Sequence, residues 1–393
     1  MRGYGDSGAR GLKEQRNQNK RSRSQMMPRK PTRPVKVGSV QIGGGATISV
    51  QSMTKCDTLN VPEVLRQIQA LEEAGCDIVR VAAPTLDAAE KFKEIRKGTN
   101  IPLVADVHFD YRIALKVLEA GIDKLRINPG NIGARWKVEE VVKACQDRGV
   151  PIRIGVNAGS LEDEFLEQYG YPTPEGMVGS ALKHIGILED LNFQNTVVSI
   201  KASNVPMMID AYTMLSEKVD YPLHVGVTEA GTPFQGTIKS SVGLGTVLAR
   251  GIGDTIRVSL STDGPEEIRV GYEVLKALGL RTRGINIISC PSCGRVQIDL
   301  VKVANEVEKR LQHIEAPLNV AVMGCVVNGP GEAAEADVAL FGGKGVGMLY
   351  LGGDQVRKTT EEEMVEALVD LVEKKQEEYK AGGTIKAHGH GRG

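Results

Sequence analysis

Short apolar runs rich in β-branched residues recur from residue 47 onward, each followed by a loop and a longer stretch. Those longer stretches, such as 61–74 and 110–120, repeat apolar residues near every 3.6 positions, which is typical of helices that pack on one face. Gly75, Gly121 and Gly149 follow such stretches, where the residue after a helix needs a positive φ. The eight apolar runs cover residues 47–53, 77–83, 102–108, 124–130, 151–157, 196–202, 222–229 and 255–261.

Apolar strands that alternate with helices predict a parallel sheet buried on both faces, and therefore an α/β fold. Eight such units, the last completed by a helix over 265–279, occupy roughly 230 residues and fit a (β/α)8 TIM barrel. An open doubly wound sheet is the alternative. No GxGxxG follows the first strand, which argues against a dinucleotide-binding fold.

A small α+β domain is predicted after a linker at 280–284. Its strands correspond to the segments INIISCP, LNVAVMGC, ADVALFG and GVGMLYL, and its helices to 294–312 and 360–379, with Thr359 or Thr360 as the N-cap of the second helix. We therefore divide the chain into four parts: a basic extension 1–31, a barrel 32–280, a small domain 281–380 and a tail 381–393.

Composition changes this picture mainly at the ends of the chain. The chain is 41% hydrophobic and 25% charged, as in ordinary globular proteins, and its 4% of aromatic residues favours neither base stacking nor a nucleic-acid partner. No apolar run approaches the roughly 18 residues that span a membrane. Residues 1–30 carry nine Arg or Lys against two acids, a net of +7, which leaves −7 for the rest of a neutral chain. We expect a disordered basic extension that is not a secretory signal, and a cytoplasmic protein.

Five predicted barrel strands carry a basic residue inside an apolar run, namely Arg80, Arg126, Arg153, Lys201 and Arg257. Any one of them alone suits an ion pair or an outward side chain. Few acids accompany them: Asp106 and Glu229 lie on strands, and Asp77 and Asp123 lie at strand starts. At least three cations thus lack an evident partner. Because an unpaired buried charge costs several kcal/mol, the barrel is expected to bind an anion, and arginine suits phosphate oxygens.

Polar residues also gather toward the carboxyl ends of the predicted strands, where barrel enzymes build active sites. Asn157 and Ser259 are examples. Asp106 and His108 are two residues apart, so they face the same side of the third strand. Glu229 ends the seventh strand. Asp106 and Glu229 are candidate proton donors or bases, and His108 is either a site residue or a core histidine.

The strongest chemical signal lies in the small domain. Cys290-Pro-Ser-Cys293 is followed by Cys325 in MGCVVNGPGE, with Glu332 seven residues further on. Thiolates at this spacing suit a soft metal centre, and a second CxxC, as in a zinc ribbon with four thiolates, is missing. An iron–sulfur cluster with one iron less tightly held is the first interpretation. Zinc, a redox dithiol and plain buried cysteines remain alternatives.

These motifs together resemble bacterial 4-hydroxy-3-methylbut-2-enyl diphosphate synthases of the non-mevalonate isoprenoid route. The resemblance runs from about Thr32 to Tyr379, without the large inserted domain of plant-type members. It rests on CPSC with Cys325 and NGPGE, on VGVTEAG around Glu229, on LVADVHFD around Asp106 and His108, and on LRINPGN around Arg126. The basic extension and the His/Gly-rich C-terminus depart from the family pattern without touching a motif.

The resemblance implies an oxidoreductase that opens and reductively dehydrates 2-C-methyl-D-erythritol 2,4-cyclodiphosphate with two electrons. It implies a [4Fe–4S] cluster on Cys290, Cys293, Cys325 and Glu332, with flavodoxin or ferredoxin as electron donor. Arg126, Arg153 and Lys201 carry over as diphosphate contacts, and Glu229 as the acid/base group. Arg80, Asn157, Arg257 and Ser259 carry over as residues around the diphosphate.

A homodimer in which each cluster domain caps the partner's barrel is also expected, since the linker leaves the barrel opposite its catalytic face. Two other functions remain open at this point. One is a non-redox barrel enzyme for a phosphorylated substrate with a structural zinc domain. The other is a metal-bearing nucleic-acid binder that uses the basic extension.

Overall fold

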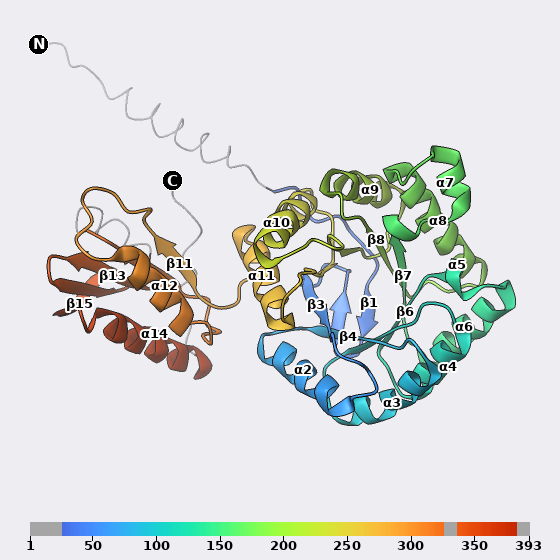
Figure 1. Cartoon of the computed structure of the whole chain (residues 1–393), viewed down its shortest axis with the longest axis horizontal. Coiled ribbons are helices and arrows are strands. Elements are labelled where there is room, and N and C mark those ends of the chain that lie inside the picture. Colours follow the sequence, from blue (N-terminus) through green and yellow to red (C-terminus); the bar gives the residue numbers. More distant parts are fainter. Residues whose placement is uncertain (1–25, 326–335, 383–393) are drawn as a thin grey trace, which may run out of the picture. The chain divides into compact units, whose positions relative to one another are not determined.

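The computed structural model describes residues 26–325 and 336–382, and the chain divides into two compact units between Leu280 and Arg281. The first unit is a barrel of eight parallel strands in the order β8-β7-β6-β5-β4-β3-β10-β9 (Figure 1). A parallel bridge between Val198 and Leu223 links β8 to the segment before β9 and closes the ring. The prediction of a TIM barrel is therefore confirmed.

Each predicted apolar run contains one barrel strand. The last two strands are short, because only two residues of each run keep regular pairing. The strands are β3 (Ser49–Met53), β4 (Ile78–Ala82), β5 (Leu103–Asp106), β6 (Lys124–Ile127), β7 (Ile152–Asn157), β8 (Thr196–Lys201), β9 (His224–Val225) and β10 (Thr255–Ile256).

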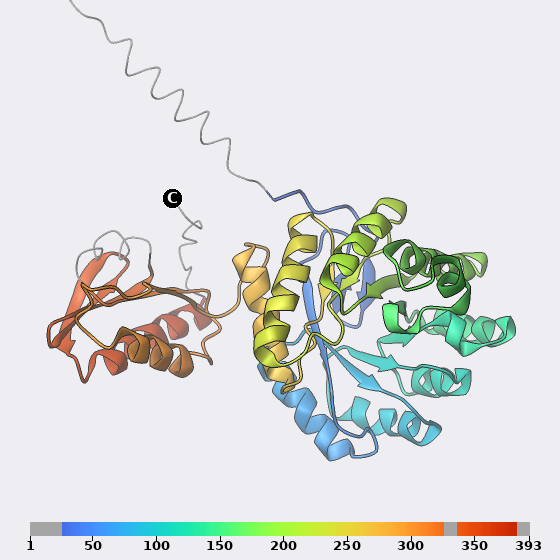
Figure 2. The ribbon, with the colours of Figure 1, turned by 45° about the horizontal axis from the view of Figure 1, so that its top comes forward.

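Helices surround the strands, and their apolar faces form one continuous core with the outward side chains of the strands (Figure 2). Gly75, Gly121 and Gly149 have φ values of 93°, 82° and 64°, which confirms the predicted helix ends. The helices are α2 (Val61–Glu73), α3 (Leu86–Lys97), α4 (Tyr111–Glu119), α5 (Pro129–Ile132), α6 (Arg135–Arg148), α7 (Asp163–Tyr169), α8 (Pro174–Asp190), α9 (Val205–Lys218), α10 (Pro233–Ala249) and α11 (Gly264–Ala277), with a short 3-10 turn at Ala158–Ser160.

An antiparallel hairpin, β1 (Val35–Val37) and β2 (Val40–Ile42), precedes the barrel. Its side chains form an apolar cluster with residues at the starts of the barrel strands, including Ile78 and Val197. The hairpin therefore closes the amino-terminal end of the barrel with apolar side chains, and polar chemistry is left to the other end.

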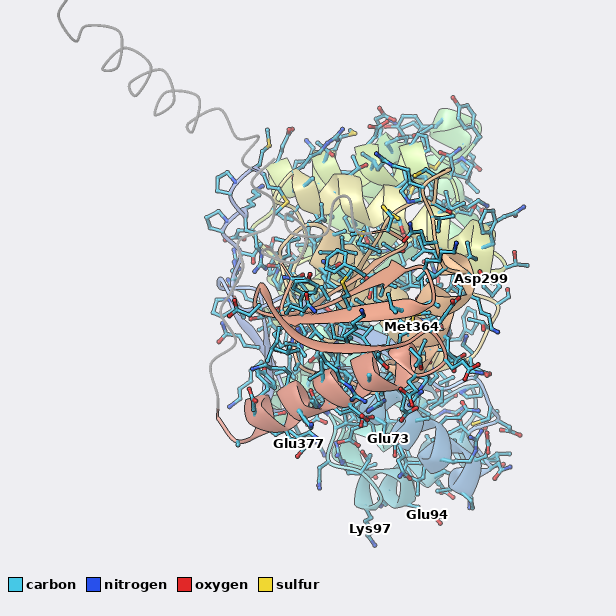
Figure 3. All side chains as sticks on the ribbon, turned by 90° about the vertical axis from the view of Figure 1, so that its left-hand side faces the viewer. Glu73, Glu94, Lys97, Asp299, Met364 and Glu377 are labelled. Atoms are coloured by element: carbon cyan, nitrogen blue, oxygen red, sulfur yellow. The ribbon has the colours of Figure 1, made fainter. Side chains whose placement is uncertain are left out.

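The second unit is a five-stranded sheet in the order β11-β12-β13-β14-β15, with the first two pairings parallel and the last two antiparallel. Helices α12 and α14 lie on the same side of this sheet (Figure 2). Figure 3 labels Asp299, whose side chain caps α12, and Met364, the first residue of α14. The elements are β11 (Asn286–Ser289), α12 (Leu300–Arg310), β12 (Asn319–Met323), β13 (Val338–Gly343), β14 (Val346–Leu351), β15 (Asp354–Thr360) and α14 (Met364–Lys380).

Two details of the predicted small domain are wrong. Thr359 and Thr360 do not cap the last helix: they end strand β15, and α14 begins after Glu363. Strand β15 was not predicted, because it is an edge strand whose residues are almost all exposed and polar. The first helix is also shorter than 294–312, since it begins at Leu300 after Asp299 caps it.

No helix in residues 26–325 and 336–382 has the length and apolar character needed to cross a membrane.

Candidate functional site

The interior of the barrel is lined with cations. In a barrel of this kind neighbouring strands are staggered by about one residue, and alternate strands supply each interior layer of four side chains. The strand pairings place three arginines in one layer and a fourth in the layer below. The upper of these layers contains Arg80, Arg126, Ser199 and Arg257, and the lower contains Gln51, Val104, Arg153 and His224.

The next layer toward the carboxyl ends of the strands contains the carboxylate that pairs with these arginines. Asp106 Oδ1 lies 2.8 Å from Nη1 of Arg126, and Oδ2 lies 3.5 Å from Nε of Arg80. Burial alone would raise the pKa of Asp106, but Arg80, His108 and Arg126 outweigh it and hold that pKa well below its usual value. Asp106 is therefore ionised at neutral pH and anchors two guanidinium groups.

Two glycines in the layer of Asp106 leave room for cations. A methyl group on Gly155 would lie 2.7 Å from Nε of Arg126, and one on Gly226 would lie 3.0 Å from Nζ of Lys201. Lys201 belongs to the layer above, so its ammonium group extends down toward Gly226. The glycines thus let the cations of β6 and β8 converge inside the barrel.

Arg153 and Lys201 are buried without a carboxylate partner in the described residues. Arg153 is 1% exposed, and its Nε and Nη1 have no hydrogen-bond partner there. Burial first, and then the neighbouring cations, lower the pKa of both side chains well below their usual values. Such orphaned donors in a closed interior indicate a site that an anion completes.

Arg257 has a partner that the sequence did not reveal. Glu267 on α11 is 1% exposed, and its Oε2 lies 3.9 Å from Nη2 of Arg257. The same carboxylate accepts hydrogen bonds from Ser52 Oγ at 2.7 Å and from the backbone N–H of Leu260 at 3.0 Å. Glu267 therefore joins the carboxyl ends of β3 and β10.

The remaining predicted residues occupy the loops at the carboxyl ends of the strands. His108 is half exposed, with Nε2 3.6 Å from Asp106 Oδ1 and 3.1 Å from Nη1 of Arg126, so it is not a core histidine. Asn157 and Ser259 are partly buried, and Glu229 is exposed. Glu229 has a φ of 52°, a left-handed conformation that residues other than glycine seldom adopt and that is often found at functional loops.

Asp77 and Asp123 do not belong to this site. Asp77 Oδ2 accepts a hydrogen bond from the backbone N–H of Val50 at 2.7 Å, and Asp123 Oδ2 accepts one from Leu103 at 2.8 Å. Each carboxylate thus fixes the start of one strand to its neighbour.

Sequence reasoning missed Lys124 and His224, which are completely buried inside the barrel. Lys124 lies two residues before Arg126 on the same strand, and His224 two residues before Gly226. Side chains two residues apart on a strand face the same side, which is how Asp106 and His108 were paired. The same rule places Lys124 on the interior side with Arg126, and His224 with Gly226.

The cysteines of the second unit lie in loops after paired strands. Cys290 directly follows β11, and Cys325 follows β12 by two residues; β11 and β12 are parallel neighbours, with Ser289 opposite Val322. Cys293 is exposed, whereas Cys290 and Cys325 are partly buried. Ser292, between the first two cysteines, has a left-handed φ of 65°, which turns the chain between them.

A guanidinium group connects the three thiols. Hydrogen bonds from the backbone N–H and then from the side chain of Arg295 lower the pKa of Cys293, and the charge of Arg295 also interacts with Cys325 and Cys290. No three Cys, His, Asp or Glu side chains in residues 26–325 and 336–382 are arranged to hold a metal ion, and Glu332 lies outside the described residues. Thiol donors that share one cationic neighbour nevertheless fit the ligand chemistry of an iron–sulfur cluster.

Fold and site together define a TIM-barrel protein with a cationic interior and a separate cysteine-bearing domain. The chain belongs to the GcpE family: residues 32–272 match the GcpE TIM-barrel domain and residues 286–374 the GcpE protein C-terminal domain. The resemblance found in the sequence is thus confirmed.

Several relatives carry the name 4-hydroxy-3-methylbut-2-en-1-yl diphosphate synthase (flavodoxin). The protein of that name from Symbiobacterium thermophilum is 83% identical over 367 residues, which cover 93% of this chain and 99% of the relative. That from Geobacter sulfurreducens is 60% identical over 343 residues, 87% of this chain and 97% of the relative. Among solved structures, Yersinia pestis dihydropteroate synthase is similar with a TM-score of 0.46 and 13% identity, over 63% of this chain and 97% of that one. The non-redox zinc alternative finds no support in these names.

Proposed function

We propose that this protein converts 2-C-methyl-D-erythritol 2,4-cyclodiphosphate into 4-hydroxy-3-methylbut-2-enyl diphosphate. The carbon–oxygen bond at one end of the cyclic diphosphate breaks, one hydroxyl leaves as water, and two electrons and one proton balance the new carbon–carbon double bond. The observation that carries the proposal is that the barrel interior holds more positively charged side chains than the carboxylate of Asp106 can neutralise. The chain is also 83% identical to a protein named as a synthase of this product. A diphosphate supplies the charge that this interior lacks.

The cations have distinct tasks in this proposal. Arg126, Arg153 and Lys201 bind the diphosphate, and Arg80, Arg257, Asn157 and Ser259 lie around it. They hold the diphosphate while its bond to carbon breaks, so that the opened substrate does not leave early. Asp106 forms ion pairs with Arg80 and Arg126 and fixes their orientation, and His108 lies beside it.

Glu229 is the proposed acid/base group, because its carboxyl is exposed at the carboxyl end of the barrel and is held there by a left-handed backbone. Asp106 is a poor proton donor at neutral pH, since its pKa lies well below its usual value. The proton for the departing hydroxyl is therefore assigned to Glu229.

The cofactor of the proposal is a [4Fe–4S] cluster held by Cys290, Cys293, Cys325 and Glu332. Bound there, it would supply the two electrons and a Lewis acid for the leaving oxygen. Flavodoxin, named in the relatives, or ferredoxin is the proposed donor of those electrons. Arg295 lies beside the thiolates and offsets part of their negative charge.

A homodimer with sites shared between chains is also part of the proposal. Helix α11 has 14 residues and runs back from the catalytic end of the barrel over about 21 Å. Leu280 is still tied to that helix by a hydrogen bond to Leu275 at 2.9 Å, and Gly284 already bonds to Glu315 at 3.0 Å. The four steps between them span at most about 14 Å, so the linker favours delivery of the cysteines to a second chain.

An anaerobic assay tests the function. Protein purified without oxygen and supplied with a chemical reductant is incubated with the cyclic diphosphate, and the product is identified by mass spectrometry. Turnover to the enyl diphosphate, with iron and sulfide bound, is the expected result. Zinc without sulfide, or no turnover in protein with a full complement of iron, would contradict the proposal.

A further inference from the structure

Below the arginine layer, the closed part of the barrel interior is polar. Gln51, Arg153 and His224 lie in one layer, and Lys124 and Thr255 lie in the next, above the apolar hairpin. Lys124, His224 and Thr255 are all 0% exposed. Barrel interiors are usually filled at these levels by branched apolar side chains, so ionisable groups there call for a physical reason.

Lys124 crosses the barrel. Its Nζ lies 3.3 Å from Oε1 of Gln51 on β3, while Lys124 itself belongs to β6, three strands away. Both ring nitrogens of His224, Nε2 of Gln51 and Oγ1 of Thr255 have no hydrogen-bond partner in the described residues. Apart from the hydrogen bond between Lys124 and Gln51, the side chains of this cluster therefore pair neither with one another nor with a carboxylate in the described residues.

The surrounding charges disfavour a proton on Lys124 or His224. Burial first, and then the cations nearby, lower the pKa of both side chains well below their usual values. The only interior carboxylate in the described strands is Asp106, which already pairs with two arginines. The charged groups that act on Lys124 and His224 are Arg80 on β4, Arg153 on β7 and Lys201 on β8. The hydroxyl of Tyr212 on α9 donates a hydrogen bond to the backbone O of His224, and the hairpin contributes the apolar Val35, Val37 and Ile42.

We propose that Lys124 and His224 are proton-accepting positioning residues beneath the diphosphate site: both are neutral in the anion-free protein and take up protons when the diphosphate binds above Arg153. The inference rests on the proposed function, since it needs an anion in the cationic layers. A nearby negative charge favours the charged form of both bases. By linkage, the diphosphate binds more weakly as pH rises, by up to roughly tenfold per pH unit for each proton taken up.

This arrangement suits the proposed reaction. Opening the ring frees one phosphate oxygen from carbon, which leaves a terminal phosphate and so adds a negative charge to the bound diphosphate. Protonated Lys124 and His224 offset that charge from below, without touching the substrate. In the empty enzyme the same two groups stay neutral, which spares the barrel further repulsion among its cations.

Calorimetry of the anaerobic full-length enzyme without reductant tests the proposal. The probe is the cyclic diphosphate itself, because each of its phosphorus atoms carries a single, strongly acidic oxygen and the ligand releases or binds no proton near neutral pH. Titrations at pH 8 in buffers of different ionisation enthalpy measure the protons taken up on binding. We expect about one to two protons per site, and an affinity that falls between pH 7 and pH 9.

Variants assign the protons. Lys124→Met and His224→Gln should each reduce the uptake, and the double variant should retain at most the proton that Lys201, whose pKa is also lowered, takes up, with a weaker dependence of the affinity on pH. Lys116→Met is the matched control, a lysine on the outer helix α4 that pairs with Glu90, and it should keep the full uptake. Undiminished uptake in the double variant would assign the protons to Lys201 and overturn the proposal.

The wild-type enzyme decides the matter even where a variant does not fold. Binding of the cyclic diphosphate with no proton uptake and no dependence on pH would refute the role of Lys124 and His224 while leaving the proposed function intact. Absence of binding would instead refute the proposed function, so the two failures are distinct.

Discussion

Gly155 and Arg126 share one space inside the barrel: a methyl group on Gly155 of β7 would lie 2.7 Å from Nε of Arg126 on β6. That separation is shorter than real contacts of a methyl group allow, so the guanidinium group and a side chain at position 155 exclude each other. Arg126 has little freedom to move away, because its Nη1 is bound to Asp106 at 2.8 Å.

Gly155→Ala should therefore displace Arg126 and weaken binding of the cyclic diphosphate by about tenfold or more, while the barrel still folds with a loss of about 1–2 kcal/mol. Calorimetric titration and thermal unfolding measure the two effects. Gly186→Ala on α8, where a methyl group meets nothing within 4 Å, is the control and should be neutral or slightly stabilising. Equal affinities in the two variants would show that Arg126 does not contact the ligand.

Arg153→Met should stabilise the anion-free protein or leave it unchanged, since it removes a buried charge without a carboxylate partner and keeps the side chain's bulk. The same change should weaken binding of the cyclic diphosphate by tenfold or more. Arg148→Met, at an exposed position near the end of α6, should alter neither quantity. A marked loss of stability together with wild-type affinity would mean that Arg153 serves the fold alone.

Glu267→Gln should raise KM more than it lowers kcat. The carboxylate holds Ser52 and the N–H of Leu260, and so positions the segment that carries Arg257 and Ser259 without touching the substrate itself. Loss of a buried ionic partner should also lower the free energy of unfolding by about 3 kcal/mol. Glu266→Gln, whose partner is the exposed Arg269, is the neighbouring control. An unchanged KM would indicate a purely structural carboxylate.

The features of this structure that could be predicted are those that show in the local sequence, and the features that were missed depend on contacts between distant segments. The strands and helices of the barrel alternate in hydrophobicity along the chain, so their positions and the fold were predicted correctly. Strand β15 carries no such signal, because an exposed edge strand buries almost nothing. The cations were visible as breaks in apolar runs, whereas the pairing of Arg257 with Glu267 depends on how α11 packs between β3 and β10. Lys124 was overlooked because a single lysine at a strand start is usually an exposed residue.

The stability of the anion-free barrel should rise with pH between about pH 6 and pH 9. Lys124, Lys201 and His224 have folded-state pKa values well below those of the unfolded chain, about 10.4 for lysine and 6.5 for histidine. In that window the unfolded chain binds more protons, so the free energy of unfolding increases as pH rises. Asp106 also has a depressed pKa, so its slope has the same sign but falls at lower pH: its stabilising contribution is complete above about pH 4 and is lost on acidification.

Urea unfolding at several pH values measures this slope. The chain has one tryptophan, Trp136 on α6, so its fluorescence reports on the barrel alone. Lys124→Met combined with His224→Gln should flatten the slope. A stability that is constant or falls from pH 6 to pH 9 would contradict the assignment of neutral bases to the barrel interior.

Two mixed dimers test whether each active site is built from two chains. In the first, one chain carries Cys325→Ser and the other Glu229→Gln. If the cysteines of one chain serve the barrel of the other, one of the two sites combines an intact barrel with an intact cluster domain and about half of the wild-type activity returns. In the second, one chain is wild type and the other carries both substitutions. Shared sites then each contain one defect, and activity should be nearly absent; sites contained in one chain predict the reverse in both dimers.

Affinity purification through two different tags and measurement of bound iron verify each pairing before the assay. Half of the wild-type activity from the second dimer, or a fully active monomer, would refute the shared site and would mean that the cysteines of each chain serve the barrel of the same chain.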